Sequence, residues 1–179
     1  MNRRTFLAGA TGALVPSAPA VQSRRPRNVL LMIADDLGFH TGAYGDAVAR
    51  TPNLDRLARD GVRFSNAFCT TASCAACRSV ILSGLHNHAN GHYGHAHAEH
   101  NQQYLPFVRP LPRVLKDAGY RTGLIGKLHV NPASALPFDT SAPGIQRGVF
   151  EMAGIARKFI QESSGRPWYL HVGFGDPHR

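Results

Sequence analysis

The chain has 179 residues, of which 43% are hydrophobic and 17% are charged, and its formal net charge at pH 7 is +9. This length suffices for one domain with a real core, and the composition excludes an intrinsically disordered protein. The basic balance fits an anionic substrate, although scattered solvated charge explains it equally well.

The first twenty residues, MNRRTFLAGATGALVPSAPA, have the pattern of a twin-arginine export signal. Arg3 and Arg4 precede a short apolar run that ends in small residues, and we predict cleavage after Ala20. Because a membrane span takes about 20 apolar residues, stable membrane insertion is not expected. Residues 21–27 follow as a polar linker, and loss of the two arginines would lower the charge from +9 to +7. We therefore expect export through the bacterial twin-arginine translocon, to the periplasm or beyond.

Residues 28–179 are predicted to form an α/β domain with a mainly parallel sheet flanked by helices. The first strand, NVLLMIA at 28–34, ends abruptly in two aspartates, as a buried parallel strand does. Apolar runs predict further strands at 62–68, 121–125 and 168–174. Cap signals and helical periodicity predict helices at 51–61, from 79 onward, at 111–118 and at 150–161. Residues 85–109 are expected to be a long polar loop.

Reactive side chains follow three of these predicted strands. They are Asp35 and Asp36 after the first, Lys127 and His129 after 121–125, and Asp176 and His178 after 168–174. Parallel sheets of this class place their ligands beyond the carboxyl ends of the strands. The sequence therefore predicts that a site assembles at this end of the sheet.

The adjacent aspartates, Asp35 and Asp36, have two interpretations. Such pairs often serve only as a helix cap and a turn residue. Neighbouring carboxylates without nearby cations repel each other, however, and a hard divalent cation removes that cost. Because Ca²⁺ takes 6 to 8 oxygen ligands, two aspartates make only part of a site.

All three cysteines lie in one stretch, CTTASCAACRSVILSG, at 69–84. Cys74 and Cys77 form a C-x-x-C, which suits a zinc ligand pair completed by histidines from His86–His100. A redox couple is a second interpretation, since Cys74 would lie at a helix N-terminus, where a thiolate is stabilised. Cys69 could join either thiol in a disulfide. A further possibility is that one cysteine is the precursor of a catalytic group.

The segment SCAACRSVILSG resembles the signature of the type I sulfatases, the formylglycine-dependent hydrolases of the alkaline phosphatase superfamily. That signature runs Cys, any residue, Pro or Ala, any residue, Arg, a small residue, apolar positions, then Ser or Thr with Gly. Cys74 and Arg78 match it, as does the Ser-Gly pair at 83–84. Ala76 stands where Pro is usual, and Cys77 where Ser is usual. The resemblance assigns no role to Cys69.

Other blocks of the chain resemble the same family in the same order. They are NVLLMIADDLG, TPNLDRLARDGVRFSNAF, LKDAGYRTGLIGKLHV and DPHR, and together they extend from Asn28 to Arg179. The segments GLHNHANGHYG, GKLHVNPASALPFD and RPWYLHVGFGDPHR are most similar to the heparan N-sulfatase (sulfamidase) branch.

The family differs from this chain in length and in one metal-binding block. Its members have a second, smaller C-terminal subdomain, and an Asp-Asn pair that completes their metal site has no counterpart here. We therefore expect residues 28–179 to be the N-terminal portion of a catalytic domain, inactive and poorly stable alone. Tight Ca²⁺ binding and sulfamate cleavage by the purified 179-residue chain would contradict this expectation.

The resemblance implies a nucleophile and a metal ion. Cys74 would be oxidised to formylglycine by a maturase in the cytoplasm, and the hydrated aldehyde would attack sulfur. Asp35 and Asp36 would hold one Ca²⁺, which also binds the modified residue 74 and a sulfate oxygen. A cation at this place neutralises charge that develops on the sulfate.

The resemblance also implies four further catalytic residues. Arg78 would orient and stabilise the hydrated aldehyde, and Lys127 would bridge to the sulfate. His178 would protonate the leaving group, and His129 would take a proton from the second hydroxyl to expel sulfate.

The implied activity is hydrolysis of a sulfuric ester or sulfamate on a sulfated glycan or a small sulfated substrate, with N-sulfated glucosamine favoured over an O-sulfated sugar. Nucleic acid is not an expected partner. One alternative is a phosphodiesterase or phosphonate hydrolase of the same superfamily. Another is a periplasmic histidine-rich metal-binding protein that uses Cys74, Cys77 and the loop His86–His100.

Overall fold

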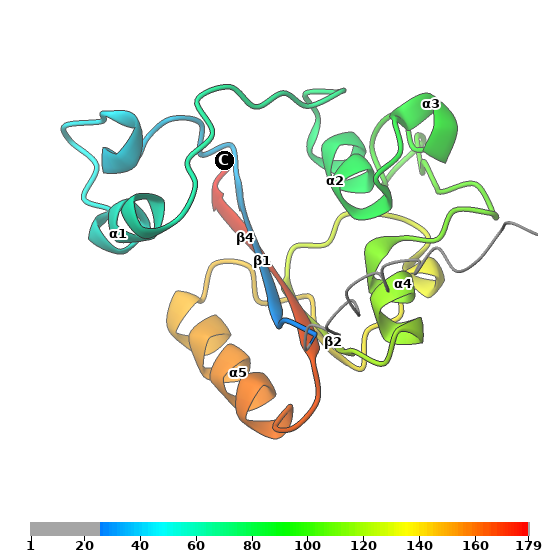
Figure 1. Cartoon of the computed structure of the whole chain (residues 1–179). Coiled ribbons are helices and arrows are strands. Elements are labelled where there is room, and N and C mark those ends of the chain that lie inside the picture. Colours follow the sequence, from blue (N-terminus) through cyan, green and yellow to red (C-terminus); the bar gives the residue numbers. More distant parts are fainter. Residues whose placement is uncertain (1–25, 179) are drawn as a thin grey trace, which may run out of the picture.

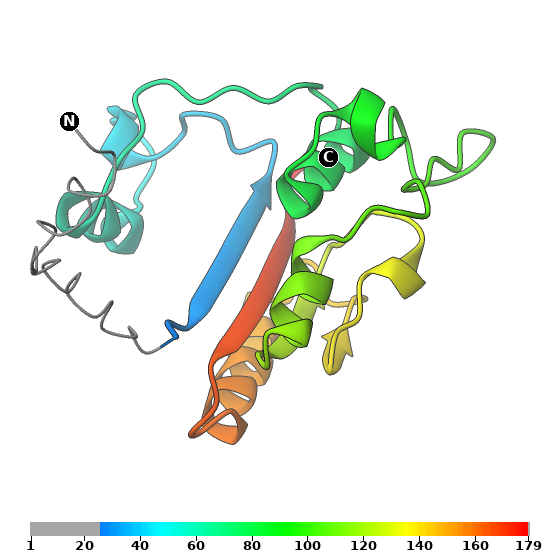
Figure 2. The same ribbon diagram turned by 45° about the vertical axis from the view of Figure 1, so that its right-hand side comes forward.

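The computed structural model describes residues 26–178 as one parallel sheet with helices on both of its faces (Figures 1 and 2). The predicted export signal and residues 21–25 of the linker lie outside the described residues. The described residues form four strands in the order β1-β4-β2-β3, and every neighbouring pair is parallel. Their bounds are Val29–Asp35 for β1, Arg121–Gly126 for β2, Thr140–Ala142 for β3 and Trp168–Pro177 for β4. The predicted fold class is therefore confirmed.

Within residues 26–178, five α-helices and two short 3₁₀ turns connect the strands. The helices are α1 (Pro52–Asp60), α2 (Cys74–Ser83), α3 (Asn87–Asn90), α4 (Leu111–Asp117) and α5 (Val149–Glu162), and the turns are η1 (Gly42–Tyr44) and η2 (Ala133–Ala135). Helix α5 covers one face of the sheet, while α2 and α4 lie on the other side (Figures 1 and 2). Between residues 26 and 178, no helix combines the length and the apolar character needed to cross a bilayer.

Two apolar clusters, one on each side of the sheet, make up the core. Beneath α5 the cluster consists of Ile125, Met152, Phe159, Leu170 and Val172. On the other side it consists of Leu82, Tyr104, Val108, Val130 and Leu136. Because successive side chains of a strand point to opposite faces, β4 contributes Leu170 and Val172 to the α5 side only. The sheet is thus held from both sides along its central strands.

Most of the predicted elements are present. Helix α1 begins at Pro52 and ends before Gly61, as predicted, and α4, α5, β2 and β4 cover the predicted ranges within a few residues. Helix α2 begins at Cys74, five residues before the predicted start at 79. The histidine-rich loop contains the short helix α3, and the three-residue strand β3 carried no recognisable sequence pattern.

The predicted strand at 62–68 is wrong. This segment runs in extended form from α1 to α2 and pairs with no described strand (Figure 1). Its apolar side chains face solvent, with Val62, Phe64 and Phe68 between 67% and 94% exposed. Apolar and β-branched composition favours a strand only where a neighbouring strand and a covering layer are present, and here both are missing within the described residues.

The prediction that the first strand is buried is also wrong. Strand β1 is at the edge of the sheet, and Val29, Leu30 and Met32 are between 36% and 48% exposed. Its last residue, Asp35, is nevertheless buried. Ion pairs with Arg78 and Lys127, not apolar cover, account for this difference.

Candidate active site

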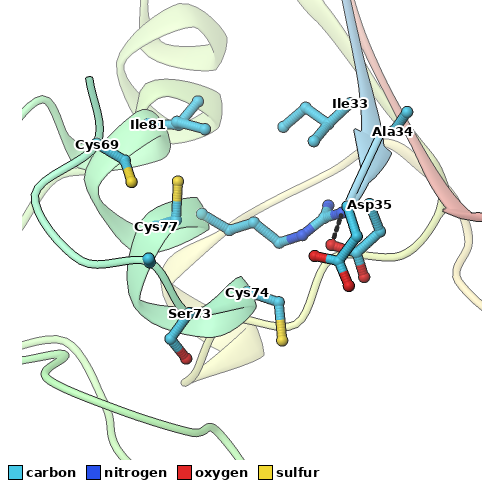
Figure 3. Close-up of a pocket in the computed structure, with 11 residues that line it drawn as sticks. Ile33, Ala34, Asp35, Cys69, Ser73, Cys74, Cys77 and Ile81 are labelled. Carbon is cyan, nitrogen blue, oxygen red and sulfur yellow. Dashed lines mark hydrogen bonds and ion pairs between the residues drawn. The ribbon is translucent and has the colours of Figure 1, made fainter. Parts of the chain in front are cut away.

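A pocket of about 250 Å³ opens between the carboxyl end of β1 and the N-terminal half of α2. It is lined by Asp35, Asp36, Cys74, Cys77 and Arg78 among others (Figure 3). Cys74 is the first residue of α2, so its thiol lies at the positive end of the helix dipole. The residues predicted from the first strand and from the cysteine stretch therefore line one pocket.

Asp35 is the charged centre of this pocket and is only 5% exposed. Its Oδ1 is 3.4 Å from Nη2 of Arg78, and its Oδ2 accepts a hydrogen bond from Nζ of Lys127. Arg78 itself is 2% exposed and donates from Nη1 to the backbone carbonyl oxygen of Lys127, at 3.0 Å. These contacts join the ends of β1 and β2 to α2.

The buried cations decide the charge state of Asp35. Burial alone would raise its pKa, but the hydrogen bond from Lys127 and the positive charge of Arg78 outweigh burial and hold the pKa below its ordinary value. Asp35 is therefore a carboxylate at neutral pH. A buried charge of this kind is stable only while its partners stay in place.

Asp36 and His178 meet where β1 and β4 end. Asp36 has a φ of +61°, in the left-handed region, and its Oδ2 lies 2.5 Å from Nδ1 of His178. The register brings them together, because Asp35 is paired with Pro177 across the two strands. Arg147 contacts the carboxyl end of β4. It forms an ion pair with Asp176 and donates from Nη2 to the carbonyl oxygen of His178, at 2.7 Å.

His129 lies beyond the end of β2, also with a left-handed φ of +56°. Its Nε2 is 2.9 Å from Nδ1 of His97, and the two rings are stacked with centroids 5.1 Å apart. Burial, together with the positive charge of Lys127, lowers the pKa of His129 to about 4. The imidazole is therefore neutral at pH 7. Its Nδ1 is buried and has no hydrogen-bond partner among the described residues.

A tether holds His97 beside His129. Asn131, two residues beyond His129, donates from Nδ2 to the carbonyl oxygen of Ala96, at 2.5 Å, and to Oδ1 of Asn101, at 3.2 Å. The loop that carries His97 is thus fixed to the segment that carries His129.

The oxygen donors of Asp35 and Asp36 suit Ca²⁺ by type, because hard cations prefer carboxylates. Both oxygens of Asp35 contact cationic side chains in this structure. Within residues 26–178, no three side chains of the His, Cys, Asp and Glu types are grouped so as to hold a metal ion. Asp35 and Asp36 by themselves therefore offer fewer oxygen ligands than the 6 to 8 that Ca²⁺ takes. The alternative zinc centre, built from Cys74, Cys77 and the histidine loop, has no support in the part of the chain that the structure describes.

The structure thus places Asp35, Asp36, Cys74 and Arg78 around one pocket, and Lys127 joins them through its ion pair with Asp35. His178 joins them through Asp36, whereas His129 does not line the pocket and lies beyond Lys127. Two neighbours of the site were not predicted, His97 and Arg147. The first belonged to a histidine-rich stretch with irregular spacing, and the second carried no motif at all.

A family model described as "Sulfatase" matches residues 27–155. Human N-sulphoglucosamine sulphohydrolase is 44% identical to the chain over 162 residues, which is 87% of this chain and 32% of the human protein. Mouse steryl-sulfatase is 38% identical over 63% of this chain and 19% of its own length. The chain therefore spans about a third, or less, of these relatives.

Solved structures share the fold. One is a protein in complex with its substrate D-glucosamine-2-N,6-O-disulfate, with a TM-score of 0.71, 24% identity, and coverage of 87% of this chain and 35% of that one. Another is the phosphonate monoester hydrolase of Agrobacterium radiobacter, with a TM-score of 0.65, 21% identity, and coverage of 87% and 42% respectively. At these identities the likeness concerns the fold alone.

Proposed function

The chain belongs to the sulfatase family, and from this premise we propose that it carries the nucleophile-bearing part of an active site that hydrolyses sulfuric esters or sulfamates of a sulfated glycan. One observation carries the proposal. Cys74 at the start of α2 lines a pocket together with the buried Asp35 and Arg78, and Asp35 is also paired with Lys127. Two fixed cations beside a potential nucleophile are what an anionic sulfate group requires.

Two groups would be added to this pocket. When bound or formed there, Ca²⁺ on Asp35 and Asp36 would supply positive charge to sulfate oxygens, and formylglycine derived from Cys74 would supply an oxygen nucleophile. Cys74 is a free thiol of intermediate exposure, so a maturase has a chemically intact substrate. Ala76 and Cys77 depart from the usual signature but do not alter the position of Cys74 at the helix start.

Arg78 and Lys127 would act as fixed cations. Arg78 is almost fully buried, and hydrogen bonds to Asp35 and to the backbone of Lys127 hold its guanidinium in one orientation. Charges that are oriented before the reaction need no reorganisation in the transition state, and removal of one such donor typically costs about 10²–10³ in turnover. We expect a loss of this size for Arg78→Lys, which keeps the charge but not the planar fork.

Two histidines would move protons. His178, oriented by Asp36, would give a proton to the leaving amine or alcohol. Nδ1 of His129 has no partner in the described residues, and the lowered pKa keeps the ring neutral, so this nitrogen can accept a proton at neutral pH. General acid–base groups contribute about 10²–10⁴ to a rate, and we expect losses in this range for His129→Ala and for His178→Ala.

For the substrate we propose an N-sulfated glucosamine of the heparan type. The human relative, N-sulphoglucosamine sulphohydrolase, and the structural neighbour with bound glucosamine disulfate support this choice. An O-sulfated sugar is the alternative, since N-acetylglucosamine-6-O-sulfatase of Bacteroides thetaiotaomicron is 35% identical over 61% of this chain.

The first test is chemical and needs no turnover. After co-expression with a formylglycine-generating enzyme, the tryptic peptide 64–78 should lose ~18 Da at residue 74, as expected for conversion of a thiol to an aldehyde. The variant Cys74→Ser, with Cys77 intact, is the matched control. An unmodified Cys74 under conditions that convert a known substrate of the same enzyme would contradict the proposal.

The second test concerns the reaction. In the full-length protein, N-sulfated glucosamine, 6-O-sulfated glucosamine and a phosphonate monoester are compared at equal concentration, with and without Ca²⁺ chelation. We expect the highest kcat/KM on the N-sulfated sugar, and loss of turnover in Cys74→Ala and after chelation. Preference for the phosphonate would instead support the phosphonate hydrolase alternative.

We also propose that the protein leaves the cytoplasm folded, through the twin-arginine translocon, after Cys74 has been modified. The residues that carry this proposal are Arg3 and Arg4. Replacing both with Lys should retain the full-length precursor in the cytoplasm, as measured by cell fractionation and N-terminal sequencing. Unchanged export of that variant would contradict the proposal.

A further inference from the structure

The three cysteines differ in what their sulfur atoms face. All three line the pocket at the start of α2, Cys69 from the preceding segment and Cys74 and Cys77 from the helix. In Figure 3 the sulfur atoms of Cys69 and Cys77 lie side by side, whereas the sulfur of Cys74 points away from them. Cys74 and Cys77 are three positions apart in α2, and their thiols point in different directions around the helix.

Hydrogen bonds fix the Cys69 segment against α2. Asn87 accepts at Oδ1 from the hydroxyls of Thr70 and Thr71, at 2.7 and 2.8 Å. The same side chain donates from Nδ2 to the carbonyl oxygen of Ala76, at 3.0 Å. Asn87 is buried, 7% exposed, and its bond to Ala76 is buried, while its bonds to the two threonines are partly buried. One amide thus joins the residues that follow Cys69 to the residue that precedes Cys77.

The surroundings of the two thiols suit a stepwise oxidation. Cys69 is exposed, so an oxidant in solution reaches it first. Cys77 is partly buried, and burial, followed by its contact with the Cys69 thiol, raises its pKa. A thiol of this kind reacts slowly with an external oxidant and is better suited to attack a neighbouring sulfur.

We propose that Cys69 and Cys77 form a disulfide when the protein meets a small disulfide oxidant such as oxidised glutathione, and that Cys74 stays outside this bond. The thiolate of Cys69 attacks one sulfur of glutathione disulfide, which forms a mixed disulfide and releases one glutathione thiolate. The thiolate of Cys77 then attacks the Cys69 sulfur and releases the second glutathione. Two protons leave the cysteines, and their two electrons reduce glutathione disulfide.

The bond would have two consequences. It ties the exposed segment that precedes α2 to the helix, closing a loop that includes Cys74 and one wall of the pocket. It also uses the thiol of Cys77, so that Cys77 cannot form a disulfide with Cys74. This second consequence rests on the proposed function, because it matters only if Cys74 is the precursor of the nucleophile.

Differential labelling tests the pairing directly. The full-length protein is incubated with oxidised glutathione, free thiols are blocked with iodoacetamide, and the disulfide is then reduced and labelled with N-ethylmaleimide. All three cysteines fall in the tryptic peptide 64–78, so tandem mass spectrometry reads each label by position. We expect iodoacetamide on Cys74 and N-ethylmaleimide on the other two. A maleimide on Cys74, or iodoacetamide on all three, would overturn the proposal.

Matched variants separate this pairing from general thiol reactivity. Cys74→Ala should oxidise at the wild-type rate and carry N-ethylmaleimide on Cys69 and Cys77, whereas Cys69→Ser should lose the rapid oxidation of Cys77. Circular dichroism of each variant checks that it is folded. Equal oxidation of Cys77 in Cys69→Ser and in wild type would count against the proposal even if the labels were otherwise as expected.

A last measurement separates the inference from the function on which its consequence rests. A formylglycine-generating enzyme is applied in vitro to wild type and to Cys69→Ser, each reduced or pre-oxidised. The reduced forms should be converted equally. Pre-oxidised Cys69→Ser should be converted less than pre-oxidised wild type, because without Cys69 the thiol of Cys77 is free to form a disulfide with Cys74. If even reduced wild type is not converted, the proposed function fails, while the labelling result still decides the disulfide.

Discussion

Strands β1 and β4 are neighbours with similar apolar sequences and opposite environments. Leu30 in β1 and Leu170 in β4 are partners in the parallel register, yet Leu30 is 48% exposed and Leu170 is fully buried. The difference lies in the layers around them, since Leu170 packs beneath α5 whereas β1 is at the edge of the sheet. An apolar run thus predicts a strand but not its burial.

At the carboxyl ends of the same two strands the difference in exposure is reversed. Asp35 at the end of β1 is buried among Arg78 and Lys127, while the side chain of Asp176 near the end of β4 is 52% exposed. The body of the sheet is therefore held by apolar packing, and the site at its end by paired charges. Each of the following predictions tests one side of this contrast.

The largest expected effect is in the body of the sheet. Leu170→Ala removes a fully buried side chain and should lower the free energy of unfolding by about 3–5 kcal/mol. Its register partner provides the control: Leu30→Ala, on the exposed strand, should cost less than about 1 kcal/mol. Urea denaturation of the two variants measures both. Equal losses would mean that β1 is covered in solution.

The next effect concerns the charged ends. Arg78→Ala leaves Asp35 buried with Lys127 as its remaining partner, and should cost about 3 kcal/mol, the lower end of the range for a broken buried ion pair. Arg147→Ala removes the exposed partner of Asp176 and should cost less than about 1 kcal/mol. Thermal unfolding at low and high salt distinguishes them, because only the exposed pair is screened. If Arg147→Ala lowered the free energy of unfolding as much as Arg78→Ala, the buried and the exposed ion pair would not differ as proposed.

A smaller effect depends on pH and on the buried His171 of β4. Burial, with the positive charge of Arg78, lowers its pKa from 6.5 to about 4. Between pH 6.5 and pH 4, His171 binds a proton in the unfolded chain but not in the folded chain. The free energy of unfolding is therefore unaffected by His171 above pH 6.5 and decreases as the pH falls toward 4. Linkage gives a loss of about 2 kcal/mol between pH 7.5 and 5.

The control for this prediction is the variant His171→Leu, which has no group to protonate at that position. Its free energy of unfolding, measured by denaturant titration across the same pH range, should fall by about 2 kcal/mol less than that of wild type. Parallel pH profiles for the two proteins would show that His171 is not the group responsible.

Several features followed from the sequence alone. The apolar runs at 28–34, 121–125 and 168–174 became strands, because a continuous apolar run of that length pairs and packs in an α/β sheet. Pro52 and Gly61 marked the start and the end of a helix, because proline suits the first helical position and glycine the position after the last. The reactive residues met at one end of the sheet because parallel strands align their carboxyl ends. The signature around Cys74 indicated the family.

Other features were decided only by the tertiary structure. Whether β1 is covered, and whether 62–68 finds a partner strand, depends on distant segments that no local pattern reports. The contact of His97 with His129 and the contact of Cys69 with Cys77 likewise join positions whose spacing carries no signal. Local sequence determines which conformations a segment prefers and which chemistry it offers. The burial of a segment and its contacts with distant segments depend on how the layers pack, so only the assembled sheet and its helices determine them.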